Sequence, residues 1–429
     1  MSSPYKTFST YTFGCKVNFA DTSSISRSLI DMGFVKIDFN ENPDIYLINT
    51  CSVTENADKK AIRLIKKIIK NNSKAKVIVT GCYAQLKPKE IVDIPGVSLV
   101  IGMENKFDIA EILEKDIPYN GIMNTEINNI DNFQITYSIN ERTRAFVKIQ
   151  DGCDYLCTYC TIPKARGNSR SLNIEDTIKH IEYIVKKGAK EIILSGINVG
   201  DFGINNNENL AMLLQEIENI DKLERYRISS IEPNLISDEI LDIMSVSNKA
   251  LPHFHIPMQS GSDKILSKMK RRYNKKQYKE IIGKVLNKIP NVSIGVDVIV
   301  GFPGENDQDF LETYSFIKSL DVAYLHVFKF SERLNTEAVD ISDKILEDVK
   351  NDRRKKLVNL SNYKKELFIN KNIGKTFNVL FESQEDDLWQ GLTDNYIKVY
   401  MKDSQNYKNK IIPVKLLENK QFVVGEKYV

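Results

Sequence analysis

Three cysteines, Cys153, Cys157 and Cys160, follow one another at the spacing C-x3-C-x2-C, directly after an apolar run at 145–149. Cysteine thiolates are the usual ligands of iron–sulfur clusters. Three thiolates in one tight loop would hold three irons of a four-iron cluster and leave the fourth iron open to a substrate. A zinc site would want a fourth Cys or His nearby, and the next histidine, His180, lies twenty residues further on. The spacing therefore favours a cluster loop.

The other three of the six cysteines are Cys15, Cys51 and Cys82. Six are too few for a disulfide scaffold in a chain of 429 residues, and a reducing compartment would keep them as thiols. Two sets of three favour two metal sites over three disulfides. One such cysteine alone would mean little, because buried free cysteine is common in protein cores.

Residues 1–120 alternate between strand and helix patterns, which predicts a parallel sheet covered by helices. Each of these three cysteines falls one to three residues after a predicted strand. Parallel sheets bind ligands beyond the carboxyl ends of their strands, so we expect a second three-thiolate site at one edge of this sheet. Gly14 and Gly81, beside Cys15 and Cys82, would let the backbone approach a bulky cluster. The strands are expected at 7–13, 44–49, 76–80 and 97–101.

A second series of strands and helices follows a stretch at 121–140 that reads as a linker. Its six units, within 141–372, predict an open barrel rather than the closed eight-fold form. The cluster loop follows the first of these strands, at the face where barrel active sites lie. His253, His255 and His326 fall in strand patterns, where packing is a commoner role than metal ligation. The strands are expected at 145–150, 191–194, 226–229, 253–256, 293–300 and 323–330.

The C-terminal region, 373–429, contains short alternating segments that predict a small antiparallel β-barrel. Its single Trp389 and its tyrosines and lysines are compatible with an RNA-binding face and equally with an edge-packing module. The fold class is thus α/β in three parts: an N-terminal parallel-sheet domain, an open (β/α)6 barrel and a small β-barrel.

Composition is that of an ordinary globular protein, with 42% hydrophobic and 27% charged residues. No apolar run approaches the ~20 residues that span a bilayer, and the first residues carry no signal-peptide pattern, so a cytoplasmic location away from membranes is expected. The net charge is only +3, but basic residues cluster at 59–76, 264–276 and 353–356. Such runs are usually solvated helix faces, although they are compatible with a nucleic-acid partner.

This order of domains resembles the radical SAM methylthiotransferases over essentially the whole chain, and the terminal barrel resembles their TRAM domain. The boxes Gly14-Cys15-Lys16-Val17-Asn18 and 142–153 are similar to the branch that acts on threonylcarbamoyladenosine beside the tRNA anticodon. The isopentenyladenosine branch usually has Gln and Met where Lys16 and Val17 stand. One departure is Asn335, where the family generally has Gly; Asn tolerates positive φ better than most residues.

The resemblance implies two 4Fe-4S clusters and S-adenosyl-L-methionine (SAM) as cofactors. The catalytic cluster, which cleaves SAM to a radical, would be held by Cys153, Cys157 and Cys160. Tyr159, in the same loop, would contact the cofactor. That radical would remove the adenine C2 hydrogen, which is not acidic enough for a general base. The second cluster, on Cys15, Cys51 and Cys82, would carry the sulfur. SAM contacts are implied at Gly196, Ser229 and Glu232.

The implied partners are the anticodon region of tRNA, an electron donor protein and a sulfur donor of unknown identity. Two substrates of the same family remain open: isopentenyladenosine in tRNA, and an aspartate of a ribosomal protein. An alternative of a different class is a non-catalytic RNA-binding protein whose loops are stabilised by zinc.

Overall fold

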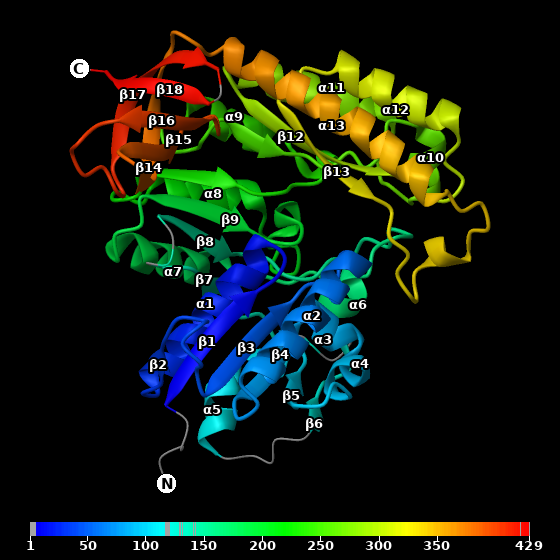
Figure 1. Ribbon diagram of the computed structural model, residues 1–429. Coiled ribbons are helices and arrows are strands. Elements are labelled where there is room, and N and C mark those ends of the chain that lie inside the picture. The colour runs from blue at the N-terminus through cyan, green and yellow to red at the C-terminus, as the bar shows by residue number, and fades with distance from the viewer. Residues whose placement is uncertain are drawn as a thin grey trace. The chain divides into compact units, whose positions relative to one another are not determined.

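The computed structural model of the protein describes residues 6–115, 121–127, 130, 132–139, 141, 143–420 and 422–428. These form two compact units (Figure 1). The first comprises the described residues up to Ser138, together with Phe146–Leu172 and Ser331–Thr336. The second comprises Ile139–Ala145, Asn173–Phe330 and the described residues from Glu337 onward. Both cysteine triads therefore belong to the first unit.

The first unit is built on a six-stranded sheet with the order β2-β1-β3-β4-β5-β6, in which every neighbouring pair is parallel. Helices cover both faces, so the inner strands β3 and β4 are buried along almost their whole length and are mostly apolar, as in other parallel sheets. Tyr46 and Ile48 face α2, whereas Ile45 and Leu47 face α1 and α5. The strands are β1 Thr7–Thr12, β2 Val35–Lys36, β3 Ile45–Thr50, β4 Lys76–Gly81, β5 Val97–Ile101 and β6 Gly121–Met123.

Helices follow the strands in the alternation that the sequence predicts. Thr54 caps α2 by accepting a hydrogen bond from the Ala57 backbone N–H, which satisfies one otherwise unpaired donor of the first turn. The helices are α1 Lys16–Asp31, α2 Glu55–Asn71, α3 Cys82–Leu86, α4 Pro88–Val92, the 3-10 turn η1 Asn105–Phe107, α5 Ile109–Glu114 and α6 Ile162–Arg166.

Two short strands lie within the stretch that the sequence predicts to be a linker, β6 and β7 (Thr136–Tyr137). β7 pairs antiparallel with β8 (Arg144–Lys148) through Thr136↔Lys148 and Tyr137↔Val147. The cluster loop directly follows β8. Its starting position is therefore held by this strand pair.

The second unit contains the parallel strands that follow the cluster loop. β9 pairs with β10, and β11, β12 and β13 form a three-stranded sheet in that order. Bridges at Tyr226↔Ala250 and Ser230↔His255 join β10 to the start and end of β11. The strands are β9 Glu191–Ser195, β10 Arg225–Ile228, β11 His253–His255, β12 Ser293–Val300 and β13 Tyr324–Lys329.

Helices separate these strands, and α7, α8, α9, α11 and α12 begin at side chains that cap them. Asn173, Asn209, Ser237, Asn274 and Asn306 each accept a hydrogen bond from the backbone N–H three residues ahead. Such caps satisfy donors at the helix start. The helices are α7 Ile174–Lys186, α8 Leu210–Glu218, α9 Asp238–Val246, α10 Asp263–Lys268, α11 Lys275–Lys288, α12 Asp307–Ser319 and α13 Glu347–Asn370.

The C-terminal strands form the expected small barrel, closed in the order β14-β15-β16-β18-β17. Trp389 is only 4% exposed and packs with Phe381, Val399 and Val414 in its core. Trp389 is therefore not available to stack on a base, so an RNA-binding face of the barrel would have to use other side chains. The strands are β14 Thr376–Glu385, β15 Leu388–Leu392, β16 Lys398–Lys402, β17 Ile411–Asn419 and β18 Val423–Lys427. Among the described residues, no helix is both long and apolar enough to span a membrane.

Candidate functional site

The structure places the three N-terminal cysteines at the carboxyl ends of three neighbouring strands. Cys15 is the residue before α1, shortly after β1. Cys51 directly follows β3, and Cys82 directly follows β4 as the first residue of α3. Because β1, β3 and β4 are adjacent in the sheet, one edge presents all three thiols.

The three thiols also lie close together. A Cβ built on Gly14, whose φ is +99°, would meet Cys51 Cβ at 2.7 Å and its Sγ at 3.0 Å. Only glycine therefore lets Cys15 and Cys51 approach in this way. Burial raises the pKa of the Cys51 thiol to about 12, and the nearby Cys82 and Cys15 thiols add to the rise. Three adjacent thiolates need a positive charge among them, which a bound iron–sulfur cluster supplies, so the donor set fits such a group.

The cluster loop is framed by hydrogen bonds at its base. Asp151 and Arg170 form a two-way backbone bridge, and the Cys153 N–H donates to Gly167 O at 3.0 Å. Gly152 has φ +73°, and a Cβ there would lie 1.8 Å from Asn168 O. The two ends of the loop thus pack backbone against backbone, a closeness that only glycine permits.

Backbone amides point at two of the three sulfurs of this loop. The Tyr155 N–H lies 3.4 Å from Cys153 Sγ, and the Ile162 N–H lies 3.5 Å from Cys160 Sγ. Such donors stabilise thiolates and tune the cluster that they bind. All six cysteines of the chain are free thiols. The loop therefore fits the cluster that its spacing predicts, while Tyr159 is half-buried beside it.

A network of buried charges lies between the cluster loop and α1. Asp21, fully buried, contacts Lys106 Nζ at 2.5 Å and Lys148 Nζ at 3.0 Å. Asp151 accepts from Arg166 at 2.7 Å and lies 3.4 Å from Lys148. Although burial raises the pKa of Asp21, the cations around it outweigh that effect and hold the pKa well below its usual value. Buried charges persist only when paired in this way.

We expect the Asp21→Ala substitution to lower the free energy of unfolding by about 3–5 kcal/mol, because it leaves Lys106 and Lys148 buried without their carboxylate. The low pKa of Asp21 means that its contribution is complete at neutral pH and is lost only in strong acid. Urea unfolding of the metal-free protein at neutral pH measures the effect. The matched control is Glu55→Ala, which removes an exposed pair with Lys59 and should cost about 0.2–1 kcal/mol. Equal losses in the two variants would contradict a structural role for the network.

The residues predicted to contact SAM lie at the ends of β9 and β10 in the second unit. Gly196 directly follows β9 and Ser229 directly follows β10. The Ser229 N–H donates to Leu194 O at 3.0 Å, which aligns the two strand ends. Glu232 is ion-paired with the buried Arg271, a partner that the sequence did not predict.

A polar cluster on β10 to β13 has no counterpart among the residues predicted to form the site. The Ser230 hydroxyl lies 2.6 Å from His255 Nδ1, and His255 Nε2 lies 2.9 Å from Asp297. His255, Asp297 and His326 bring one possible ligand atom each within 4.8 Å of one another. Asp297 and His326 are register partners on the adjacent strands β12 and β13, so their side chains lie on the same face of the sheet. The signal in the sequence is the alternation of side chains along each strand, with a period of two residues.

The segment 331–336 brings a second buried arginine to the first unit. Arg333 is 5% exposed, pairs with Asp58 at 2.8 Å and hydrogen-bonds Ser52, the neighbour of Cys51. Asn335 has φ +64°, so the turn for which the family generally uses glycine survives with asparagine, as expected. Its carbonyl accepts a hydrogen bond from Lys164 on α6.

Two family models match the chain. The radical SAM superfamily matches residues 147–317, which include the cluster loop. The uncharacterized protein family UPF0004 matches residues 7–102, which include Cys15, Cys51 and Cys82. Each cysteine triad thus lies within one of the two matches.

Among known proteins, the chain is 38% identical to the threonylcarbamoyladenosine tRNA methylthiotransferase MtaB of Bacillus subtilis, over 95% of this chain and 93% of that protein. It is 32% identical to the tRNA-2-methylthio-N(6)-dimethylallyladenosine synthase of Lachnoclostridium phytofermentans, over 97% and 94%. The solved structure of the radical S-adenosylmethionine methyltransferase TsrM of Kitasatospora setae shares the fold, with a TM-score of 0.59 and 14% identity over 79% of this chain and 77% of that one. Relatives this similar over nearly the whole length, and cysteines in both matched regions, show that the chain belongs to the radical SAM methylthiotransferase family.

Proposed function

We propose that this protein attaches a methylthio group to C2 of N6-threonylcarbamoyladenosine beside the anticodon of tRNA, with SAM and two 4Fe-4S clusters as cofactors. Membership of the radical SAM superfamily implies SAM and a 4Fe-4S cluster. The observation that carries the proposal of a second cluster is the presence of two separate cysteine triads in one compact unit. Cys153, Cys157 and Cys160 lie in one loop. Cys15, Cys51 and Cys82 lie at one edge of the parallel sheet.

The residues of each site have separate tasks in this proposal. When bound, the loop cluster would supply the electron that cleaves one SAM to a radical able to remove the C2 hydrogen, the sheet-edge cluster would supply sulfur, and another SAM would supply the methyl group. Cys153, Cys157 and Cys160 hold the first cluster, and the amides of Tyr155 and Ile162 donate to their sulfurs. Tyr159, Gly196, Ser229 and Glu232 orient SAM. Cys15, Cys51 and Cys82 hold the second cluster.

The choice of threonylcarbamoyladenosine rests on the relatives. Four proteins named for that substrate are 33–38% identical to this chain, and four named for dimethylallyladenosine are 32–35% identical. Lys16 and Val17, which follow the first cysteine, resemble the threonylcarbamoyladenosine branch of the family. Dimethylallyladenosine, the nucleoside called isopentenyladenosine above, is therefore the second candidate substrate. The reaction also requires an electron donor protein and a sulfur donor, which we propose as transient partners.

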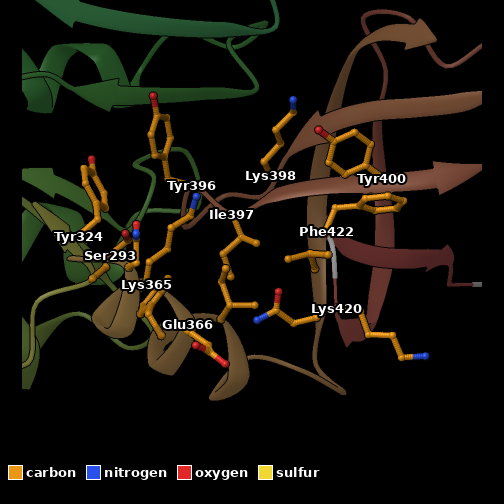
Figure 2. A pocket seen from close by; sticks show the side chains of 16 residues that line it. Ser293, Tyr324, Lys365, Glu366, Tyr396, Ile397, Lys398, Tyr400, Lys420 and Phe422 are labelled. Carbon is orange, nitrogen blue, oxygen red and sulfur yellow. The ribbon is translucent and has the colours of Figure 1, made fainter. Parts of the chain in front are cut away.

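A groove on the second unit supports an RNA partner. It has a volume of about 660 Å³ and lies between α13, the starts of β12 and β13, and strands β16 and β18. Figure 2 shows Tyr400 and Phe422 side by side on its wall, with ring centroids 4.7 Å apart, and Lys398 beside them. Lys365 and Lys420 line it as well. Aromatic faces beside lysines suit nucleotide bases and phosphates.

Nucleoside analysis of tRNA tests the proposal. Cells that lack this protein should lose 2-methylthio-N6-threonylcarbamoyladenosine and accumulate the unmodified N6-threonylcarbamoyladenosine, as measured by liquid chromatography with mass spectrometry. The wild-type chain and the matched variant Leu156→Ala, which changes an exposed side chain in the loop of Cys153, should restore the product. Cys153→Ala should not. Loss of the methylthiolated dimethylallyladenosine instead would select the second candidate.

A further inference from the structure

Arg166 is a buried cation at the end of the cluster loop. It is the last residue of α6 and only 1% exposed. Its Nη1 donates to Asp151 at 2.7 Å, and its Nη2 hydrogen-bonds Asn18 and lies 3.6 Å from Asp21. Arg166 therefore joins the loop of one cysteine triad to α1, the helix that begins directly after Cys15 of the other.

The same side chain acts on the sheet-edge triad. Ala165 and Cys82 belong to one buried cluster, which brings the end of α6 against the start of α3. Burial raises the pKa of the Cys82 thiol, and the positive charge of the nearby Arg166 opposes that rise. The positive charge of Arg166 is also in range of Cys15. The positive charge of Arg166 therefore acts on the thiols of Cys82 and Cys15.

One donor of Arg166 remains unused. Its Nε is buried and has no hydrogen-bond partner in the described part of the chain. A buried N–H without an acceptor is costly, and native proteins rarely retain one without a reason. A 4Fe-4S cluster on Cys15, Cys51 and Cys82 would bring inorganic sulfides, which accept hydrogen bonds.

We propose that Arg166 is a positioning residue that donates its Nε–H to a sulfur of the cluster held by Cys15, Cys51 and Cys82, and so raises the reduction potential of that cluster. Hydrogen bonds to the sulfurs and nearby charge are known levers on such potentials, and a cation favours the more negative, reduced state. Asp151 and Asn18 hold the guanidinium in place. This inference rests on the second cluster of the proposed function.

Arg170 provides a matched control. It belongs to the same charged network and lies 3.8 Å from Asp151. Its guanidinium also donates hydrogen bonds to the backbone carbonyls of Asn132, Arg166 and Asn168. Arg170→Gln therefore removes one positive charge beside Asp151, as Arg166→Gln does, without removing the cation whose charge acts on the Cys82 thiol.

The test is a redox titration of the N-terminal cluster, followed by electron paramagnetic resonance. The full chain with Cys153, Cys157 and Cys160 replaced by alanine serves as the parent, so that only one cluster is observed. Arg166→Gln should lower the potential by about 59 mV, which is a tenfold shift of a one-electron equilibrium. Arg166→Lys, which keeps the charge but not the planar fork, should give a smaller shift. Arg170→Gln should keep the parent potential.

Each outcome decides the question. An Arg166→Gln potential equal to that of the parent, or an equal shift in Arg170→Gln, overturns the proposal. If Arg166→Gln binds no cluster, the reduction potential of Arg166→Lys is compared with that of the parent instead. A potential equal to that of the parent then overturns the proposal. Loss of the cluster from both Arg166 variants supports the proposal if Arg170→Gln retains it, and overturns the proposal if Arg170→Gln loses it too. A parent without iron refutes the second cluster itself, which separates that failure from this one.

Discussion

Replacing Cys153, Cys157 and Cys160 together by alanine is expected to abolish reductive cleavage of SAM and to remove roughly half of the bound iron. The loop offers three thiols, and backbone amides already point at two of the sulfurs. Without the thiolates there is no ligand set to hold the cluster that passes an electron to SAM. The measurements are iron content after anaerobic reconstitution and chromatographic detection of 5′-deoxyadenosine.

The control for this prediction is Leu156→Ala. Leu156 lies in the same loop, is 73% exposed and supplies no thiol, so this variant should keep both iron and SAM cleavage. A triple variant that retained full iron and still produced 5′-deoxyadenosine would contradict the assignment of the loop. Loss of all iron would instead show that the two sites do not load independently.

The position of the cysteines could be predicted from the sequence because it depends on regular features. Strand and helix patterns alternate clearly in the first unit, and strands end where Cys15, Cys51 and Cys82 begin the next turn. In a parallel sheet such positions share one edge. No knowledge of side-chain packing is needed for that conclusion. The closed C-terminal barrel likewise follows from short alternating segments.

The buried charges around Asp21 could not be predicted in the same way. Their members come from α1, η1, β8 and α6, and none of them forms a local motif. Single charged residues in a sequence usually belong to solvated surfaces. Only the folded chain shows that Asp21, Lys106 and Arg166 are each at most 2% exposed. The role of Arg166 between the triads is therefore a finding of the structure.

Two other residues mislead for the same reason. Arg353 begins a basic run that reads as a surface patch, yet it is 4% exposed and pairs with Glu305 at 2.7 Å and Asp307 at 2.8 Å. Trp389 reads as a stacking platform for bases but fills the barrel core. In both cases residue type indicates what a side chain can do, while burial decides whether it is accessible.

The short strands β2, β6 and β7 were not predicted because two or three residues cannot establish a period. His255 and His326 were assigned to packing rather than metal ligation, and their grouping with Asp297 was not predicted because it is assembled across strands far apart in the sequence. Register, which no single segment reveals, places these side chains together.

Replacing Cys15, Cys51 and Cys82 together by alanine is expected to leave SAM cleavage in place and to abolish methylthiolation. These thiols stand on the edge formed by β1, β3 and β4, whereas the cluster loop keeps its own ligands and its own backbone frame. The variant should therefore produce 5′-deoxyadenosine but no methylthiolated nucleoside. Anaerobic turnover with tRNA, followed by chromatography of both products, measures the two activities in one reaction.

The matched control, Val53→Ala, lies two residues after Cys51 and is 55% exposed, so it should retain both activities. Because Cys51 and Cys82 are buried, circular dichroism of the triad variant must first show that the sheet has formed. A folded variant that still attached sulfur at the wild-type rate would contradict the second cluster site. A folded variant that lost SAM cleavage as well would show that the loop depends on the sheet edge, and the buried Arg166 is the side chain through which we would then expect that dependence to act.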